Sequence, residues 1–254
     1  MDGSEATFFR DQLRQARAAA LRDSEGYQEI LFTMERIGIR LRGELGALGH
    51  YKEHLSRQSA ASPLADSLPS QWPAWHTRFD DLYDEVVHAR NDALHYGAFA
   101  RLLTSHAVQL ALVLEDALMK DATKVSQFMV RAPTTAMLWQ PVSFVRQVML
   151  ANSYSVLPVF DTTAMPPTWR LLSEGAIAKY LRSATTNEER KRRLAGTVEQ
   201  ALCEGRFAAD PAKVVTADEP VMNLLDDIEK HPVLVVNEKN ASELVGILTA
   251  FDIL

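Results

Sequence analysis

The sequence predicts an α + α/β protein, in which a helical first part is followed by an α/β second part. Apolar residues recur at helical spacing up to about residue 120, and strand-like apolar runs alternate with helical segments after it. The second part also contains its own order of elements twice. The predicted domains are therefore 1–120 and 121–254. The second divides into a first repeat at 121–182, a connecting helical segment at 183–208 and a second repeat at 209–254.

Composition limits the possible partners and compartments. Apolar residues make up 47% of the 254 residues, enough for sizeable cores, and the formal charge is −6. Nucleic acid would therefore have to bind a local basic patch. A single cysteine, Cys203, excludes an internal disulfide or a cysteine-based zinc site and suits a reducing compartment. Because we find neither an apolar signal core nor a membrane-length apolar run, we expect a cytoplasmic protein without a membrane partner.

The first part reads as a four-helix bundle. Apolar positions from Phe9 to Ala20 mark the first helix, and residues 27–59, 75–96 and 98–120 mark the other three. The stretch 59–73 holds three prolines and four serines, so it is predicted to be a loop.

The second part alternates strands and helices. We expect a short strand in FMVRAPTTAM, a helix in QPVSFVRQVMLAN, strands in SYSVLPVFD and TWRLLS, and a helix from EGAIAKYL. The same order returns in AKVVTADEP, VMNLLDDIEK, HPVLVVNEK and LVGILTAFDIL. The unit predicted to be duplicated is therefore β-α-β-β-α.

These repeats resemble a tandem pair of cystathionine β-synthase (CBS) modules, also called a Bateman module, over about residues 124–254. GILTAFDIL at 246–254 fits that family's closing G-h-h-T-x-x-D-h pattern, where h is apolar, and VLPVFD and HPVLVV fit its central strand. The resemblance implies a regulatory adenine nucleotide or nucleoside, such as ATP, ADP, AMP or S-adenosylmethionine. It assigns phosphate or ribose contacts to Thr249 and ribose hydroxyls to Asp252. The other nucleotide-binding residues that it implies are Val215, Thr216 and Pro232.

The first repeat departs from that pattern. In LLSEGAIA, Ser173 keeps a hydroxyl at the threonine position, but Ala176 stands where the aspartate belongs. We therefore expect at most one well-formed nucleoside site, on the second repeat. A pair of modules that binds no nucleotide and serves only in dimerisation remains open.

RNDALH, at residues 90–95, fits R-N-x-x-x-H. The helical part resembles the HEPN superfamily, which carries this motif at the end of the third of four helices, and the resemblance covers about residues 4–120. Many members are ribonucleases that need no metal. The resemblance implies catalytic roles for Arg90, Asn91 and His95, RNA as the substrate, a homodimer, and no cofactor for catalysis.

The residue types suit that chemistry. Histidine titrates near neutrality and can move the proton of a 2′-hydroxyl, while arginine carries a permanent donor fork for a phosphate that gains charge. Asn91 and His95 are four residues apart and share a helix face, whereas Arg90 lies about 140° around the helix from His95. Two copies across a two-fold axis would bring both groups into one groove.

Structural explanations stay open for the same residues. Arg90 can be a surface charge, and His95 a cation at a helix end. A stripe of Arg10, Arg14 and Arg17 is either a solvated face or an RNA contact. EERKRR at 188–193 reads as a solvated charge cluster, and the pair His50 and His54 as a solvated pair with no metal.

Two functions therefore remain. The first is a nucleotide-regulated, metal-independent endoribonuclease, suited to bacterial-type stress or defence regulation. The second is a non-catalytic, nucleotide-binding scaffold, also homodimeric.

Overall fold

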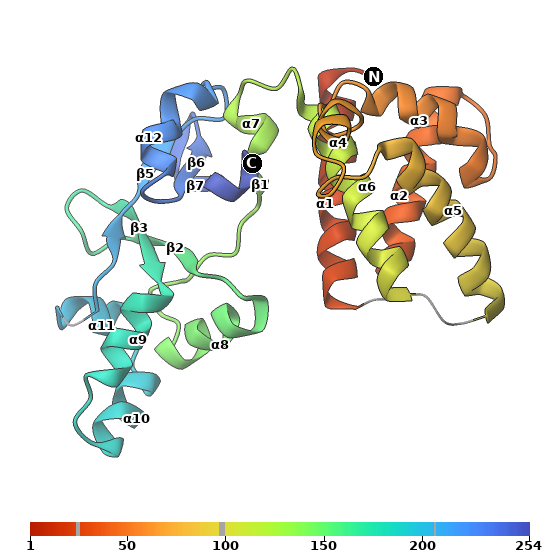
Figure 1. The fold of residues 1–254 in the computed structure, drawn as a ribbon. Helices are drawn as coiled ribbons and strands as arrows, with labels where there is room; N and C mark the ends of the chain where they lie inside the picture. The colour runs from red at the N-terminus through yellow and green to blue at the C-terminus, as the bar shows by residue number, and fades with distance from the viewer. Residues whose placement is uncertain (24–25, 97–99, 206) are drawn as a thin grey trace. The chain divides into compact units, whose positions relative to one another are not determined.

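The computed structural model describes residues 1–254 apart from 24–25, 97–99 and 206, and side chains apart from those of residues 91–101. The chain divides into two compact units, Met1–Ala122 and Thr123–Leu254 (Figure 1). The mixture of helix and sheet that the sequence predicts is confirmed, with the strands in the second unit.

The regular elements in the described residues of the first unit are all helices. Its elements are α1 (Gly3–Arg22), α2 (Tyr27–Arg42), η2 (Leu48–Tyr51), α3 (Lys52–Ser59), α4 (Ser67–Gln71), α5 (Phe79–Tyr96) and α6 (Ala100–Met119). Asp2 starts α1, because its side chain accepts a hydrogen bond from the Glu5 backbone N–H at 2.8 Å while the Glu5 side chain accepts from Asp2. Residues from α1, α2, α3, α5 and α6 share one core.

Two predicted helices differ from the observed ones. The predicted helix at 27–59 is broken, because α2 ends at Gly43, where φ is +83° and a side chain is disfavoured. The chain resumes as η2 and α3, and Leu45 in the break is 85% exposed. The helix predicted from residue 75 begins at Phe79, which leaves Trp75 80% exposed.

Helix α6 corrects one expectation about apolar runs. Its segment Leu102–Met119 is long and apolar enough to cross a membrane by length and composition. This contradicts the expectation from the sequence that the chain has no apolar run of membrane length. Slightly more than half of the segment, 56%, is buried inside the protein. Leu103, Leu110 and Leu114 on this helix are fully buried in the core of the first unit. Core packing therefore accounts for much of its apolar character.

The second unit contains two similar runs of elements. The first comprises α7 (Val125–Phe128), β1 (Val130–Arg131), α8 (Val142–Asn152), β2 (Val156–Asp161), β3 (Thr168–Ser173) and α9 (Glu174–Arg182). Helices α10 (Asn187–Ala195) and α11 (Val198–Cys203) follow. The second run comprises β4 (Asp210–Pro211), β5 (Lys213–Val215), η3 (Val221–Leu224), α12 (Leu225–Ile228), β6 (Val233–Asn237), β7 (Asn240–Leu248) and η4 (Ala250–Asp252).

These strands form two sheets, and one edge strand of each sheet comes from the other repeat. One sheet has the order β1-β7-β6-β5, and the other has the order β2-β3-β4. β1, from the first repeat, pairs antiparallel with β7 of the second, and β4 pairs antiparallel with β3 of the first. Just beyond β1, Ala136 bridges Val159 of β2 in parallel. Each repeat thus supplies a short strand to the sheet of the other.

Apolar faces join the two sheets to each other and to their helices. Trp169 and Leu171 on β3 pack in one cluster with Leu234 and Val236 on β6. The Trp169 indole N–H also donates to the Ala241 carbonyl at 2.9 Å. Two further clusters lie under the helices of the first and second repeats. The second unit is therefore held together across the repeat boundary by side chains as well as by strands.

The segment EERKRR is only partly solvated, which corrects our expectation for it. Arg193 is buried, and its guanidinium donates to the Tyr180 carbonyl and, at 2.7 Å, to Ser183 Oγ. It also pairs with Glu189 and lies 5.2 Å from the centre of the Tyr180 ring. Arg193 therefore fastens α10 to the end of α9.

Candidate functional site

Thr249 and Asp252 meet at the end of β7. The backbone N–H of Thr249 and its hydroxyl both donate to Asp252 Oδ2, each at 2.8 Å. Asp252 is buried, at 7% exposure, and forms a capping box around η4. A ribose hydroxyl that bound this oxygen would therefore replace the Thr249 hydroxyl and free it for another acceptor.

Strand register separates the predicted nucleotide-binding residues into two groups. Leu248 pairs with Val233, so Thr249 and Asp252 follow the ladder at the Pro232 end of β6. Val215 pairs with Val235, so Thr216 continues toward the opposite end. At about 3.3 Å per residue, four residues place Thr216 roughly 13 Å along the sheet from Pro232. The structure thus brings Pro232, Thr249 and Asp252 together and leaves Val215 and Thr216 apart from them.

Lys213 takes the place at this end of the sheet that we had expected for Val215. Lys213 pairs with Val233 in register, and its Nζ lies 3.4 Å from Asp227 Oδ2 on α12. The side chains of both residues are partly exposed, at 53% and 41%, so this ion pair is weak and easily exchanged. The sequence did not predict a role for Lys213, because the apolar pattern of a strand does not indicate the register in which it pairs with a parallel neighbour.

The equivalent turn of the first repeat lacks a carboxylate. Ser173 Oγ accepts a hydrogen bond from the Ala176 backbone N–H at 3.1 Å and so serves as the N-cap of α9. The Ala176 side chain offers no acceptor. This turn therefore has a hydroxyl committed to its helix and no group that can hold a pair of ribose hydroxyls.

Arg90 lies on α5 and forms an ion pair with α2. Its Nη1 is 3.2 Å from Glu35 Oε1, with side-chain exposures of 30% and 22%. It also borders a pocket of about 130 Å³ lined by α2 residues, among them Tyr27 and Phe32. Sequence reasoning missed Glu35, because the α2–α5 contact brings together positions that no local pattern connects.

Tyr83 lies close enough to that ion pair for its ionisation to be affected. Burial raises the pKa of Tyr83, and the charge of Glu35 raises it further, while Arg90 lowers it. The phenol therefore stays protonated and donates to the Leu48 carbonyl at 2.7 Å.

The other two predicted catalytic residues have undescribed side chains. Asn91 and His95 both belong to α5, which extends through Tyr96. Their side chains lie outside the part of the chain that the structure describes. The structure therefore does not describe how they lie relative to Arg90. A histidine that is described, His106 on α6, places its Nδ1 3.0 Å from Glu85 Oε2 on α5.

The arginine stripe on α1 faces the protein and not solvent, which contradicts the solvated interpretation. Arg10 is buried, at 1% exposure. Arg17 donates from two nitrogens to the two oxygens of Glu115 on α6, each at 3.1 Å. The Arg17 guanidinium therefore joins α1 to α6, and neither it nor the buried Arg10 is free for RNA phosphates.

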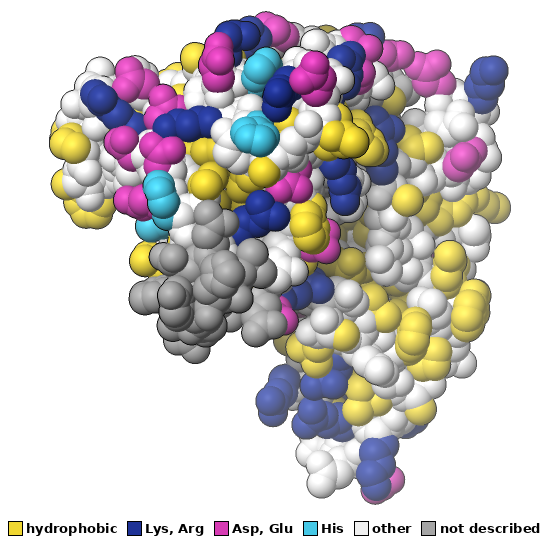
Figure 2. All heavy atoms as spheres, turned by 90° about the vertical axis from the view of Figure 1, so that its right-hand side faces the viewer, with side chains coloured by type: hydrophobic (Ala, Val, Ile, Leu, Met, Phe, Trp, Pro, Cys, Tyr) yellow, Lys and Arg dark blue, Asp and Glu magenta, His cyan; other side chains and the backbone are white. Residues whose placement is uncertain are grey.

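Charged side chains of both signs also lie on the surface of the helical unit (Figure 2). Figure 2 shows Lys and Arg side chains interleaved with Asp and Glu over the described part of one face. No group of three or more His, Cys, Asp and Glu suited to a metal ion occurs among the described residues.

Comparisons with known proteins give structural likenesses only. No family model and no curated protein matches the chain. A CBS domain-containing protein of unknown function from Bacillus anthracis is 21% identical, with a TM-score of 0.38, over 51% of this chain and 88% of that one. The CBS domain pair of protein MJ0100, in complex with 5-methylthioadenosine and S-adenosyl-L-methionine, is 21% identical with a TM-score of 0.37, over 52% and 96%. CBSX2 in complex with AMP is 17% identical with a TM-score of 0.37, over 51% and 92%. Because these identities and scores are low, the description of the fold rests on the strand order above.

Proposed function

We propose that the second unit is a CBS-like regulatory module that binds an adenine nucleotide or nucleoside at the Thr249 end of its β1-β7-β6-β5 sheet. One observation carries the proposal: Pro232, Thr249 and Asp252 meet there, beside Lys213. Carboxylate, hydroxyl and ammonium groups are the partners that ribose and phosphate require. The solved structures to which the chain is similar include complexes with AMP and with S-adenosyl-L-methionine.

In this proposal the ligand replaces a hydrogen bond and an ion pair that the site already contains. Ribose hydroxyls donate to Asp252 in place of the Thr249 hydroxyl, which then turns to a phosphate or ribose oxygen. Lys213 leaves its partly exposed pair with Asp227 at little cost and neutralises phosphate. Since Ala176 gives the first repeat no carboxylate, one ligand per chain is the expected stoichiometry.

Titration calorimetry with AMP, ADP, ATP and S-adenosylmethionine tests this site. Asp252→Ala should weaken binding by about 1.5–3 kcal/mol, the value of a hydrogen bond to a charged group. Asp226→Ala on α12, which removes an exposed carboxylate that is not among the proposed ligand groups, is the matched control. The site is refuted if none of the four compounds binds at about millimolar concentration, or if the two variants bind equally well.

RNA cleavage by the helical unit is the second candidate function. The observation that favours it is Arg90, which keeps 30% side-chain exposure and borders a pocket despite its pair with Glu35. In this proposal Arg90 binds the phosphate, His95 moves the proton of the 2′-hydroxyl and Asn91 orients His95, across the two-fold axis of a homodimer. Nucleotide binding in the second unit then regulates cleavage. The alternative is a homodimeric scaffold that cleaves nothing.

Purified protein incubated with RNA in EDTA separates these possibilities. The ribonuclease should cleave without metal and leave 2′,3′-cyclic phosphate ends or their 3′-phosphate product. His95→Ala should abolish this cleavage, and Arg90→Lys should impair it, because lysine loses the donor fork. Lys52→Ala on α3, which removes a charge that pairs with Asp84 of α5, should leave cleavage intact. Light scattering that shows a monomer at micromolar concentration would remove the composite site, and uncut RNA at every protein concentration would favour the scaffold.

A further inference from the structure

A pocket of about 700 Å³ lies between α8, α9 and α10, at a distance in the fold from the Thr249 turn. Its volume falls within the range of about 300–1,000 Å³ typical of small-molecule sites. All three helices belong to the second unit, and each contacts the other two. The pocket is therefore a feature of one compact body.

Apolar side chains form the middle of this pocket. Met149 on α8 and Ile177 and Leu181 on α9 line it, and all three are at least 95% buried. Leu150, which is 64% exposed, lines it from α8 as well. An apolar group that entered here would cover the exposed carbon surface of Leu150, which is favourable.

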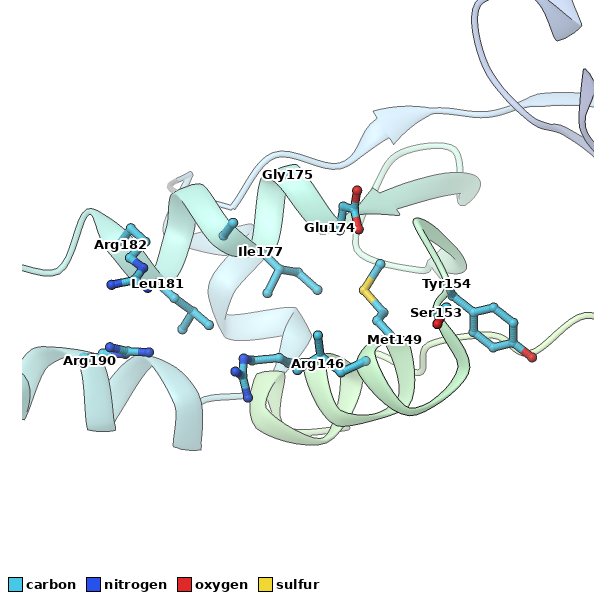
Figure 3. A pocket seen from close by; sticks show the side chains of 12 residues that line it. Arg146, Met149, Ser153, Tyr154, Glu174, Gly175, Ile177, Leu181, Arg182 and Arg190 are labelled. Carbon is cyan, nitrogen blue, oxygen red and sulfur yellow. The ribbon is translucent and has the colours of Figure 1, made fainter. Parts of the chain in front are cut away.

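Three arginines line the same pocket, one from each helix. Figure 3 shows Arg146, Arg182 and Arg190 toward one end and Glu174 toward the other, with Ile177 and Met149 between them. None of the three guanidinium groups forms an ion pair or a side-chain hydrogen bond within the described part of the chain. This sets them apart from Arg193 on the same α10, which is fully engaged.

The three unpaired arginines, together with the apolar side chains between them and Glu174, favour a ligand that carries both an anionic group and an apolar body. The guanidinium fork matches the two oxygens of a carboxylate or a phosphate, and such charge-assisted bonds are strong. An apolar molecule without charge would leave the arginines unpaired, and a small anion without an apolar body would leave the exposed Leu150 side chain in contact with water.

We propose that this pocket binds an amphipathic acid, with its carboxylate or phosphate at Arg146, Arg182 and Arg190 and its apolar body over Ile177 and Met149. Self-association through the same face fits less well. In a two-fold contact the patch meets its own copy, and one Glu174 does not neutralise three arginines. Such an interface would bury excess positive charge.

Binding of simple probes to the full chain tests the proposal. Octanoate and octyl phosphate, below their micelle concentrations, supply a carboxylate and a phosphate on the same apolar body. Octanol lacks the charge, and acetate lacks the apolar body. By calorimetry, at least one of the two octyl acids should bind at least tenfold more tightly than both octanol and acetate.

Paired variants locate the binding. The double variant Arg146→Gln and Arg190→Gln should weaken the octyl acid at least tenfold, while Arg192→Gln on the exposed side of α10 should leave it unchanged. Leu150→Ser should weaken it as well, whereas Phe144→Ser, at an exposed α8 position outside the pocket, should not. All of these positions except Arg190 are exposed, and unchanged circular dichroism would show that the variants fold.

Three results would overturn the proposal. Octanol binding as tightly as octanoate and octyl phosphate would make the arginines irrelevant. Equal effects of the Arg192 and the Arg146–Arg190 variants would place the acid elsewhere. If the pocket variants changed the sedimentation coefficient but not probe binding, the face would be a contact between copies.

Discussion

Arg193 is the residue on which the connection between α9 and α10 depends. Its guanidinium is buried and engages a backbone carbonyl, a hydroxyl and a carboxylate at once. A lysine at this position would keep one charge but lose the planar arrangement of donors that reaches all three.

Arg193→Met should therefore destabilise the second unit by about 1–3 kcal/mol, because the Tyr180 carbonyl, the Ser183 hydroxyl and the Glu189 carboxylate each lose a donor. Arg192→Met on the same helix is exposed and should change the free energy of unfolding by less than about 0.5 kcal/mol. Urea unfolding followed by circular dichroism gives both values. Equal midpoints for the two variants would contradict the role of Arg193.

Glu189, the partner of Arg193, should make stability depend on pH. Hydrogen bonds from the Thr185 backbone N–H, from Arg193 and from the Thr185 hydroxyl lower the pKa of Glu189 from 4.5 to about 2. A lowered pKa in the folded state means that the stabilisation is complete above pH 4.5 and is lost as pH falls toward 2.

The measurement is urea unfolding between pH 6 and pH 2.5. The wild-type protein should lose more stability over this range than Glu189→Gln, which cannot be protonated. Asp161 contributes to the same slope in both proteins, because the hydrogen bonds of Thr163 and the charge of Arg170 outweigh burial and lower its pKa. Identical pH profiles for the two proteins would show that Glu189 has no such effect.

At the scale of elements, Gly43 determines where α2 ends. Its φ of +83° is a left-handed conformation that costs a residue with a side chain about 1–2 kcal/mol. A Cβ at Gly43 would meet nothing within 4 Å, and neither would one at Gly49, which has no such φ. The two glycines therefore differ in backbone conformation and not in available space.

Gly43→Ala should lower the free energy of unfolding of the helical unit by about 1 kcal/mol, whereas Gly49→Ala should be neutral or stabilising. The midpoint of urea unfolding, followed by helical circular dichroism, measures the difference. If Gly49→Ala were the more damaging change, a restraint other than backbone conformation would control this break.

Periodicity predicts many of the elements, but it does not predict how they pair. TWRLLS became β3 at the predicted residues, because alternation and strand length are local properties. The placement of Lys213 instead of Thr216 beside Pro232 depends on register, which is a property of two strands together. The partners of Arg193 and Arg17 were missed for a related reason, since a buried arginine has the same sequence signature as a solvated one.

At the scale of the whole molecule, each unit has its own apolar core. The core of the first unit contains only residues up to Leu118, and the clusters of the second begin at Val125. The second unit is further unified by the two short strands that its repeats exchange.

A fragment of residues 123–254 should accordingly fold by itself, whereas residues 137–254 should not unfold cooperatively. The shorter fragment lacks β1 and Ala136, so it loses one strand partner from each sheet. It also lacks Val125 and Met129, which belong to the core of the second repeat. Urea unfolding of both fragments is the measurement, and equal cooperativity would show that the exchanged strand is dispensable.

The exchange of strands also sets an order of events during protein synthesis. β1 pairs at residue 130 with residue 247 of β7, so its partner leaves the ribosome long after β1 has done so. At about 5–20 residues per second, the delay is on the order of ten seconds. During that interval the nascent chain carries a strand with unpaired backbone groups, while the helical unit can already be complete. Translation speed and access to chaperones should therefore affect the yield of the second unit more than that of the first.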